Sequence, residues 1–203
     1  MSLTVVKLGG SFARHSRLDD LIHALESGAG RTVIVPGGGP FADCVRREQK
    51  RIGFDDHAAH RMALLAMASY GQMLAGRSTV LKPAASIGAV RQIRSNGGIP
   101  VWLPLDLLDG RPDIPESWEM TSDSLAAWLA GELGATRIIF LKRKLPAKAR
   151  VAELVAAGVV DPLVPRFLAS AHSDAWICGH RQIAELAKAL AEGGGAGRPL
   201  AVA

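Results

Sequence analysis

Two glycine-rich turns carry residues whose types and spacing could do chemistry. The first, Val5-Val6-Lys7-Leu8-Gly9-Gly10-Ser11, places paired glycines after an apolar run, with Lys7 two residues before them. Glycine lets backbone N–H groups approach a ligand closely, and a helix that starts after such a turn favours phosphate oxygens. Lys7 adds a point charge to that site. The same segment also fits an ordinary tight turn from which Lys7 extends into solvent.

The second turn follows the β-branched run at residues 32–35. Gly37, Gly38 and Gly39 come after Pro36, and Pro40 suits the first turn of a helix. Three consecutive glycines lose much conformational entropy on folding, which destabilises the folded state. A turn that needs one positive φ angle does not require all three. We therefore interpret this turn as a place where a ligand approaches the backbone. Neither turn has the spacing of a P-loop or of a dinucleotide-binding fingerprint.

A third cluster, Thr121-Ser122-Asp123-Ser124, precedes an apolar helical stretch. Thr121 or Ser122 can cap that helix, and Asp123 in its first turn suits the helix macrodipole. Capping is a sufficient reason for a helix to start here. It does not explain so dense a group of hydroxyl and carboxylate side chains, so the cluster is a candidate part of a site.

The elements that must position these motifs alternate along the chain. We expect strands at residues 3–8, 32–35, 78–81, 99–103 and 137–141, and helices at 17–26, 40–52, 56–75, 86–95, 122–133 and 180–192. Such alternation predicts a mostly parallel sheet in an α/β sandwich, with ligands at the carboxyl ends of the strands. With 203 residues, the chain is expected to form a single domain over 1–203, and residues 200–203 a last short strand or a loose tail.

Composition restricts the ligand and the compartment. The net charge of +5 suits anionic partners, but the basic residues are scattered and aromatic residues make up only 5%, which favours a small anion over nucleic acid. Cys44 and Cys178 lack metal-ligand spacing and are predicted to be buried thiols, and we expect no metal site of the chain's own. The start of the chain does not resemble a signal peptide, and no apolar run could cross a membrane, so we expect a cytoplasmic protein.

Taken together, the three motifs resemble, in order, those of the amino acid kinase superfamily. Its members share a three-layer αβα sandwich and transfer the γ-phosphoryl group of ATP, with Mg²⁺, to a carboxylate, carbamate or phosphate. The resemblance covers residues 3 to 140. It implies that Lys7 neutralises charge on the transferred group, that Asp123 orients lysine and ligand, and that the protein is a homo-oligomer. It also implies that the two turns cradle the donor and acceptor phosphates through Gly9, Gly10, Ser11, Gly37, Gly38 and Gly39.

Within the superfamily, the segment from His60 to Met67 and the placement of Trp118 before the third cluster resemble the kinases of methanofuran and methylofuran biosynthesis. Those enzymes convert aminomethylfuranmethanol phosphate to its diphosphate. The resemblance implies a small phosphorylated substrate, and an acceptor pocket lined by His60, Met62, Trp118, Thr121 and Ser122. For His60, Met62 and Trp118, packing in the core is the alternative. Another small phosphate or a carboxylate remains open as the acceptor.

The sequence departs from the superfamily after the strand at 137–141. Relatives carry an Asp-containing turn there, whereas this chain reads Lys142-Arg143-Lys144. Lys142 and Lys144 either contact ATP phosphates, or belong to a nucleotide site that has been lost, or lie in a solvated basic loop. Many relatives also have a second catalytic lysine in the C-terminal half, for which Lys148 is the nearest candidate here. A non-catalytic homologue that binds an anion or a partner subunit therefore remains an alternative.

Overall fold

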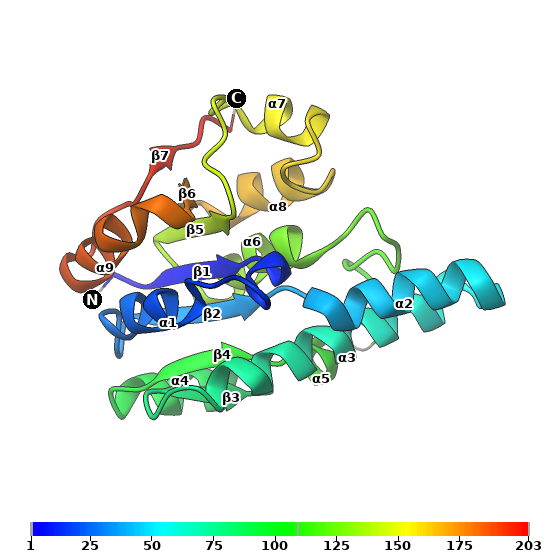
Figure 1. Cartoon of the computed structure of the whole chain (residues 1–203), viewed down its shortest axis with the longest axis horizontal. Coiled ribbons are helices and arrows are strands. Elements are labelled where there is room, and N and C mark those ends of the chain that lie inside the picture. The colour runs from blue at the N-terminus through cyan, green and yellow to red at the C-terminus, as the bar shows by residue number, and fades with distance from the viewer. Residues whose placement is uncertain (1, 109, 203) are drawn as a thin grey trace.

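A seven-stranded sheet forms the centre of the molecule in the computed structural model, which describes residues 2–108 and 110–202 (Figure 1). The strand order is β3-β4-β2-β1-β5-β6-β7. All neighbouring strands are parallel except β7, which runs antiparallel to β6, so the expected mostly parallel α/β sheet is confirmed. The strands are β1 (Thr4–Leu8), β2 (Thr32–Pro36), β3 (Leu81–Ala84), β4 (Ile99–Trp102), β5 (Arg137–Lys142), β6 (Asp174–Gly179) and β7 (Arg198–Pro199).

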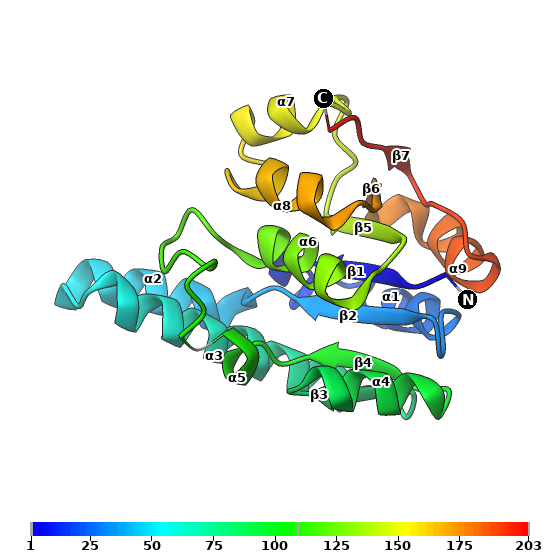
Figure 2. The ribbon, with the colours of Figure 1, turned by 180° about the vertical axis from the view of Figure 1, so that it is seen from behind.

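Helices cover both faces of the sheet and give three layers. Helices α1 and α9 lie in front of the sheet in Figure 1, and α6 and α8 lie in front of it when the molecule is seen from behind in Figure 2. Each layer encloses its own apolar cluster against the sheet. The helices are α1 (Leu18–Glu26), α2 (Gly39–Ile52), α3 (Asp56–Ala75), α4 (Ile87–Ser95), α5 (Leu105–Leu108), α6 (Ser122–Leu133), α7 (Val151–Ala156), α8 (Val164–Ala171) and α9 (Ile183–Glu192).

Strand β1 lies in the middle of the sheet, between β2 and β5. Because side chains alternate along a strand, Val5 packs with the α6 layer while Val6 and Leu8 pack with the α1 and α9 layer. The alternation places Lys7 on the α6 side, close to the carboxyl end of β1. The chain continues to β2 on one side of β1 and later returns to β5 on the other, and such a switch in strand order is where open α/β sheets bind ligands.

Two of the predicted elements are wrong in position. Strand β3 starts at Leu81 and not at residue 78, because the Ser78 hydroxyl accepts hydrogen bonds from the N–H groups of Val80 and Leu81 and so holds a turn. Pro83 is tolerated since β3 is an edge strand. Helix α9 starts at Ile183, after a short 3₁₀ turn. In the last third, β6, α7 and α8 were not expected, and the final strand lies at 198–199.

The two cysteines differ. Cys178 is buried in β6, as predicted, and burial raises the pKa of its thiol to about 12. Cys44 is exposed on α2, so the prediction for it is wrong: it lies on the polar face of the helix, with Arg47 Nη2 3.2 Å from its sulfur. Within residues 2–108 and 110–202, no helix combines the length and apolar content needed to cross a membrane.

Candidate active site

A buried ion pair joins the first and third sequence motifs. Lys7, near the end of β1, places its Nζ 2.9 Å from Oδ1 of Asp123, in the first turn of α6. The two side chains are only 7% and 6% exposed. Asp123 can reach the strand because α6 packs on the face of the sheet to which Lys7 points. The lysine and the aspartate that the motifs single out are therefore in direct contact.

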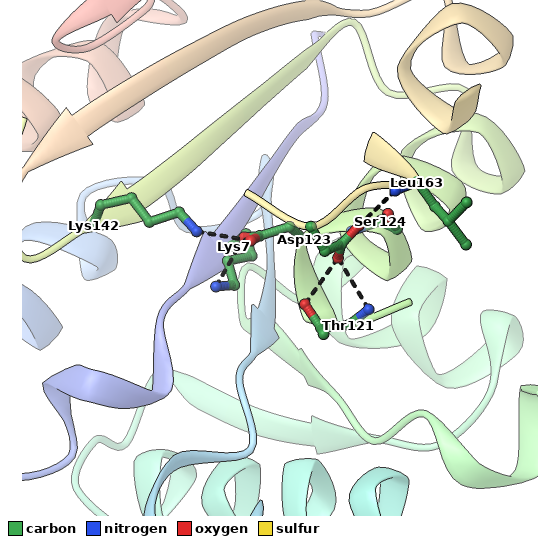
Figure 3. A network of polar contacts seen from close by, with 7 residues as sticks. Lys7, Thr121, Asp123, Ser124, Lys142 and Leu163 are labelled. Carbon is green, nitrogen blue, oxygen red and sulfur yellow. Dashed lines mark hydrogen bonds and ion pairs between the residues drawn. The ribbon is translucent and has the colours of Figure 1, made fainter. Parts of the chain in front are cut away.

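A second lysine meets the same carboxylate from the neighbouring strand. Lys142, the last residue of β5, donates a hydrogen bond from Nζ to Oδ2 of Asp123 over 2.7 Å. Alternation along β5 puts Ile138, Phe140 and Lys142 on the α6 side. Figure 3 shows the two lysine side chains converging on Asp123 from adjacent strands. The carboxylate thus holds two ammonium groups close together.

Burial and charge act in opposite directions on this cluster. Burial disfavours the ionised form of Asp123, but attraction by Lys7 and Lys142 outweighs it and keeps the pKa of Asp123 below its usual range. Burial and repulsion from Lys7 lower the pKa of Lys142 to about 8, against the attraction of Asp123 and Asp161. Asp123 is therefore ionised at neutral pH, and Lys142 titrates close to the physiological range.

The two glycine turns pack against each other, backbone to backbone. A Cβ on Gly37 would lie 2.5 Å from the backbone nitrogen of Gly10, and one on Gly10 would overlap the backbone of Gly39. Gly39 also has a φ of 53°, which favours glycine. The close contact between the turns is thus a second reason why glycine is needed at these positions, in addition to the expected approach of a ligand. Gly9 lies beside the lysine: a Cβ there would be 3.8 Å from Lys7 Nζ.

Only the second turn leads directly into an α-helix. Gly38 is the N-cap residue of α2, and Pro40 lies in its first turn as expected. The first turn continues into a short 3₁₀ helix, Gly10–Phe12, before α1. A helix N-terminus that favours phosphate oxygens therefore stands behind the Gly37–Gly39 turn, while the first turn offers backbone groups and Lys7.

A cavity of about 270 Å³ opens between these motifs, α3 and the segment before α6. Its walls include Lys7, the second glycine turn, His60, Trp118 and the start of α6. Met62 lies outside it, exposed on α3, and Met67 takes part in its place, since residues 60, 64 and 67 share one face of that helix. The lining residues are Lys7, Gly10, Ser11, Gly37, Gly38, Gly39, Ala42, Asp43, Arg46, His60, Ala63, Leu64, Met67, Trp118, Met120, Thr121, Ser122 and Leu125.

Two contacts of Trp118 with α2 hold the segment before α6 beside this cavity. Trp118 Nε1 donates a hydrogen bond to Gln49 Oε1 over 2.6 Å, and the Arg46 guanidinium lies 4.3 Å from the centre of the indole ring. Burial lowers the pKa of His60, so its imidazole is neutral at pH 7. The cavity therefore combines a neutral histidine, an aromatic wall and a guanidinium. Sequence analysis identified His60 and Trp118 but not Arg46, which only the geometry of α2 brings to the site.

A second hollow, of about 380 Å³, lies at the carboxyl ends of β5 and β6. Lys144 lines it with Arg181 and His180, whose ring centre is 5.0 Å from that of His15. Lys142 and Lys144 thus lie in different parts of the molecule: Lys142 contacts Asp123, and Lys144 lines this hollow. Lys148 is exposed and lies 3.5 Å from Glu153, away from both, so the geometry does not support it as a second catalytic lysine.

The profile of the amino acid kinase family matches residues 2–144. The chain belongs to this family. It is 29% identical over 139 residues to [5-(aminomethyl)furan-3-yl]methyl phosphate kinase of Methanocaldococcus jannaschii, a match that covers 66% of this chain and 63% of that protein.

Solved structures with the same fold include uridylate kinase from Archaeoglobus fulgidus, with a TM-score of 0.75 and 18% identity over 99% of this chain and 100% of that one. UMP kinase from Bacillus anthracis has a TM-score of 0.72 and 17% identity over 98% of this chain and 95% of its own. These similarities confirm the amino acid kinase fold.

The residues of this site can be compared with what phosphoryl transfer requires. Phosphoryl transfer depends on positioning and on positive charge placed where negative charge develops. Lys7 and Lys142 supply two ammonium groups held by one carboxylate, and glycines of both turns line the cavity beside Lys7. In the described part of the chain, no group of three or more His, Cys, Asp or Glu side chains could hold a metal ion. Mg²⁺ that is bound with ATP usually takes one or two carboxylates beside phosphate oxygens and waters, so its use would not require such a group.

Proposed function

We propose that this protein is an ATP-dependent kinase that transfers the γ-phosphoryl group to a small phosphate-bearing acceptor, converting aminomethylfuranmethanol phosphate to its diphosphate. The observation that carries the proposal is Asp123 held between Lys7 and Lys142, next to a cavity made by both glycine turns. The activity for which the relative from M. jannaschii is named, together with family membership, supports this choice of acceptor.

The acceptor would occupy the cavity beside Lys7. Its phosphate would meet Lys7 and the backbone of the glycine turns, and the furan ring would lie against apolar side chains such as Leu64, Met67 and Leu125. Among the described lining residues, Asp43 is the one carboxylate. Its Oδ1 lies 3.4 Å from Nη1 of Arg46, and it would also attract the amine of the acceptor. A cavity of about 270 Å³ has room for a single small ring and its phosphate.

The nucleotide would occupy the hollow at the ends of β5 and β6. Lys144 and Arg181 line it, and Lys142 lies on the strand between this hollow and Lys7. In the reaction, an oxygen of the acceptor phosphate bonds to the γ-phosphorus as the bond to the β–γ bridging oxygen breaks, and ADP leaves. The acceptor oxygen is already anionic, so the chain needs no general base. Lys7 and Lys142 stabilise the charge that shifts during transfer.

The direct test is turnover with the furan monophosphate, ATP and Mg²⁺, measured as ADP release and as the new diphosphate in ³¹P NMR. A panel with UMP, other small phosphates and a carboxylate identifies the acceptor class. Asp43→Asn should raise KM for the amine-bearing acceptor but not for an analogue with a hydroxyl in place of the amine. Folded protein that binds ATP and yet phosphorylates no member of the panel contradicts the proposal.

A non-catalytic homologue is the second candidate, because the cationic turn Lys142-Arg143-Lys144 replaces the acidic turn of the family. Calorimetric titration with a non-hydrolysable ATP analogue separates the two functions. No binding at millimolar concentration favours the non-catalytic protein.

We also propose that the protein acts in the cytoplasm as a homo-oligomer. Exposed apolar side chains on α2 and α3 support an oligomer, with Ile52 63% and Leu65 50% exposed. Sedimentation of the purified protein at micromolar concentration tests this, and a monomer throughout that range excludes it.

A further inference from the structure

A second buried carboxylate, Asp161, contacts the start of α6. It lies between α7 and α8, about forty positions along the chain from the residues that it binds, and is 8% exposed. Asp161 is not among the residues that line either hollow. We therefore do not expect Asp161 to bind a ligand in either hollow, and its role must follow from its hydrogen bonds within the protein.

The carboxylate of Asp161 accepts hydrogen bonds from the start of α6 and from its own loop. Oδ2 accepts from the Thr121 N–H (2.9 Å), the Thr121 hydroxyl (2.8 Å) and the Ser124 N–H (3.0 Å). Oδ1 accepts from the Ser124 hydroxyl and from the Leu163 N–H (3.2 Å). The last contact, two residues along the chain, fixes Asp161 itself at the start of α8.

Asp161 thus caps α6 from a distant part of the chain. Thr121 occupies the N-cap position, but its side chain makes no capping hydrogen bond to its own helix. The expectation that Thr121 or Ser122 caps the helix is therefore wrong, because Asp161 takes the Ser124 N–H that an N-cap side chain would bind. The rotation of the first turn of α6 depends on a residue outside that helix.

The position of Asp123 depends on that rotation. Asp123 lies between Thr121 and Ser124 in the sequence, and successive residues point about 100° apart around a helix. With Thr121 and Ser124 bound to Asp161, the Asp123 carboxylate projects to Lys7 and Lys142 (Figure 3). If the first turn rotated or frayed, Asp123 would lose contact with one lysine or both.

The charges also form one cluster. Lys142 is faced by Lys7 from β1, by Asp123 from α6 and by Asp161 from the segment before α8. Two carboxylates thereby balance two ammonium groups. The negative charge of Asp161 raises the pKa of Lys142, against burial and the repulsion of Lys7, which both lower it.

We propose that Asp161 is a positioning residue for phosphoryl transfer, which holds the first turn of α6 so that Asp123 stays between Lys7 and Lys142. This role rests on the proposed kinase function. It also makes the α7–α8 segment, which lies beyond the part of the chain matched by the family profile, a structural part of the transfer centre.

The experiment compares Asp161→Asn with wild type in the full-length protein. The variant should lower kcat by about a hundredfold through misplacement of Asp123, with little change in KM for ATP. It should also lower the pKa of Lys142, so that the alkaline limb of the pH–rate profile moves to lower pH. Ser124→Ala, which removes one hydroxyl of the same network, should give a smaller loss, and the double variant should be non-additive.

Asp113→Asn is the matched control. Asp113 also holds α6, since it accepts a hydrogen bond from Trp128 Nε1 over 3.0 Å, but it has no contact with the lysines. It should lower Tm without moving the alkaline limb. If Asp161→Asn lowers Tm but retains both kcat and the alkaline limb, Asp161 is a structural cap and the proposal is wrong. If Asp161→Asn does not fold, Ser124→Ala decides between the same outcomes.

A separate readout keeps this proposal distinct from the kinase assignment. Competitive chemical labelling of lysines, followed over pH by mass spectrometry, gives the pKa of Lys142 without any turnover. A lowered pKa in Asp161→Asn supports the coupling even if wild type phosphorylates no acceptor, in which case the kinase assignment fails by itself. An unchanged pKa contradicts the coupling even if wild type is an active kinase.

Discussion

The two hollows at the carboxyl edge of the sheet are built in different ways. The first is made by two glycine turns that contact each other, by helices α2, α3 and α6, and by Lys7 of the buried ion pair, and the contact between the turns is backbone to backbone. The second is made mainly by side chains of the loop after β5 and the turn after β6, of which Lys144 and Arg181 are exposed. Lys142 stands between them, tied to the first through Asp123.

The difference implies that the two hollows differ in how well they tolerate substitution. Backbone packing tolerates few residue types, because a Cβ at Gly10 or Gly37 would overlap the opposite turn. An exposed cationic loop can bind an anion with many sequences, since charge and not shape supplies most of the attraction. The first hollow should therefore be sensitive to single substitutions, and the second should lose affinity gradually.

Lys7→Ala should have the largest effect on the first region. Loss of an ammonium group at the transfer centre should lower kcat by about a thousandfold. Because Lys7 is buried and paired, the variant should also lose stability, by about 2 kcal/mol, as Lys142 remains to pair with Asp123. Steady-state kinetics and urea unfolding measure the two effects, with Lys188→Ala on the exposed face of α9 as the control. Unchanged kcat would remove Lys7 from the mechanism.

Lys142→Ala tests whether this lysine acts with Asp123 in phosphoryl transfer or is only part of the basic loop after β5. We expect kcat to fall by about a hundredfold, because one of two charges on the transferred group is lost. Lys148→Ala, which removes an exposed lysine paired with Glu153, should leave kcat unchanged. The reverse result, with Lys148 essential and Lys142 dispensable, would make Lys148 the second catalytic lysine and would remove Lys142 from the transfer centre.

The titration of Lys142 gives a prediction for pH. Since burial and repulsion from Lys7 lower the pKa of Lys142 to about 8, it is protonated below that pH and loses its charge above it. The value of kcat/KM, which reports the free enzyme, should fall by about tenfold per pH unit above 8. Bound phosphates favour the protonated form of Lys142, so the alkaline limb of kcat should lie at higher pH than that of kcat/KM. Lys142→Arg should remove the limb, because guanidinium does not titrate there; a limb that persists belongs to another group.

Much of the fold could be predicted because its signals are local. The β-branched runs before the glycine turns and the apolar period of residues 56–75 and 122–133 gave strands and helices close to those observed. Strand β3 was misplaced, since the Ser78 turn and an edge strand with Pro83 lack that signal. Helices α7 and α8 are short, and their boundaries depend on packing against α6 and the sheet.

The site shows the same division between local and distant information. The contact of Lys142 with Asp123 could have been inferred from alternation, because Phe140 and Lys142 must share a face of β5. The helical period of α3 could likewise have predicted that Met67, and not Met62, lies on the same face as His60. Asp161 could not have been found in this way, because its partners Thr121 and Ser124 lie about forty residues away with no local pattern to link them.

Lys144→Ala should have the smallest effect and tests the second region alone. Its side chain is exposed in the hollow after β5, where solvent and salt screen its charge, so removing it should raise KM for ATP only severalfold and leave kcat and the acceptor KM unchanged. Initial rates at 0.05 M and 0.5 M salt measure this, and the difference between variant and wild type should shrink at the higher concentration. A loss of kcat as large as that of Lys142→Ala would mean that Lys144 reaches the transferred group, and that the two hollows form one continuous site.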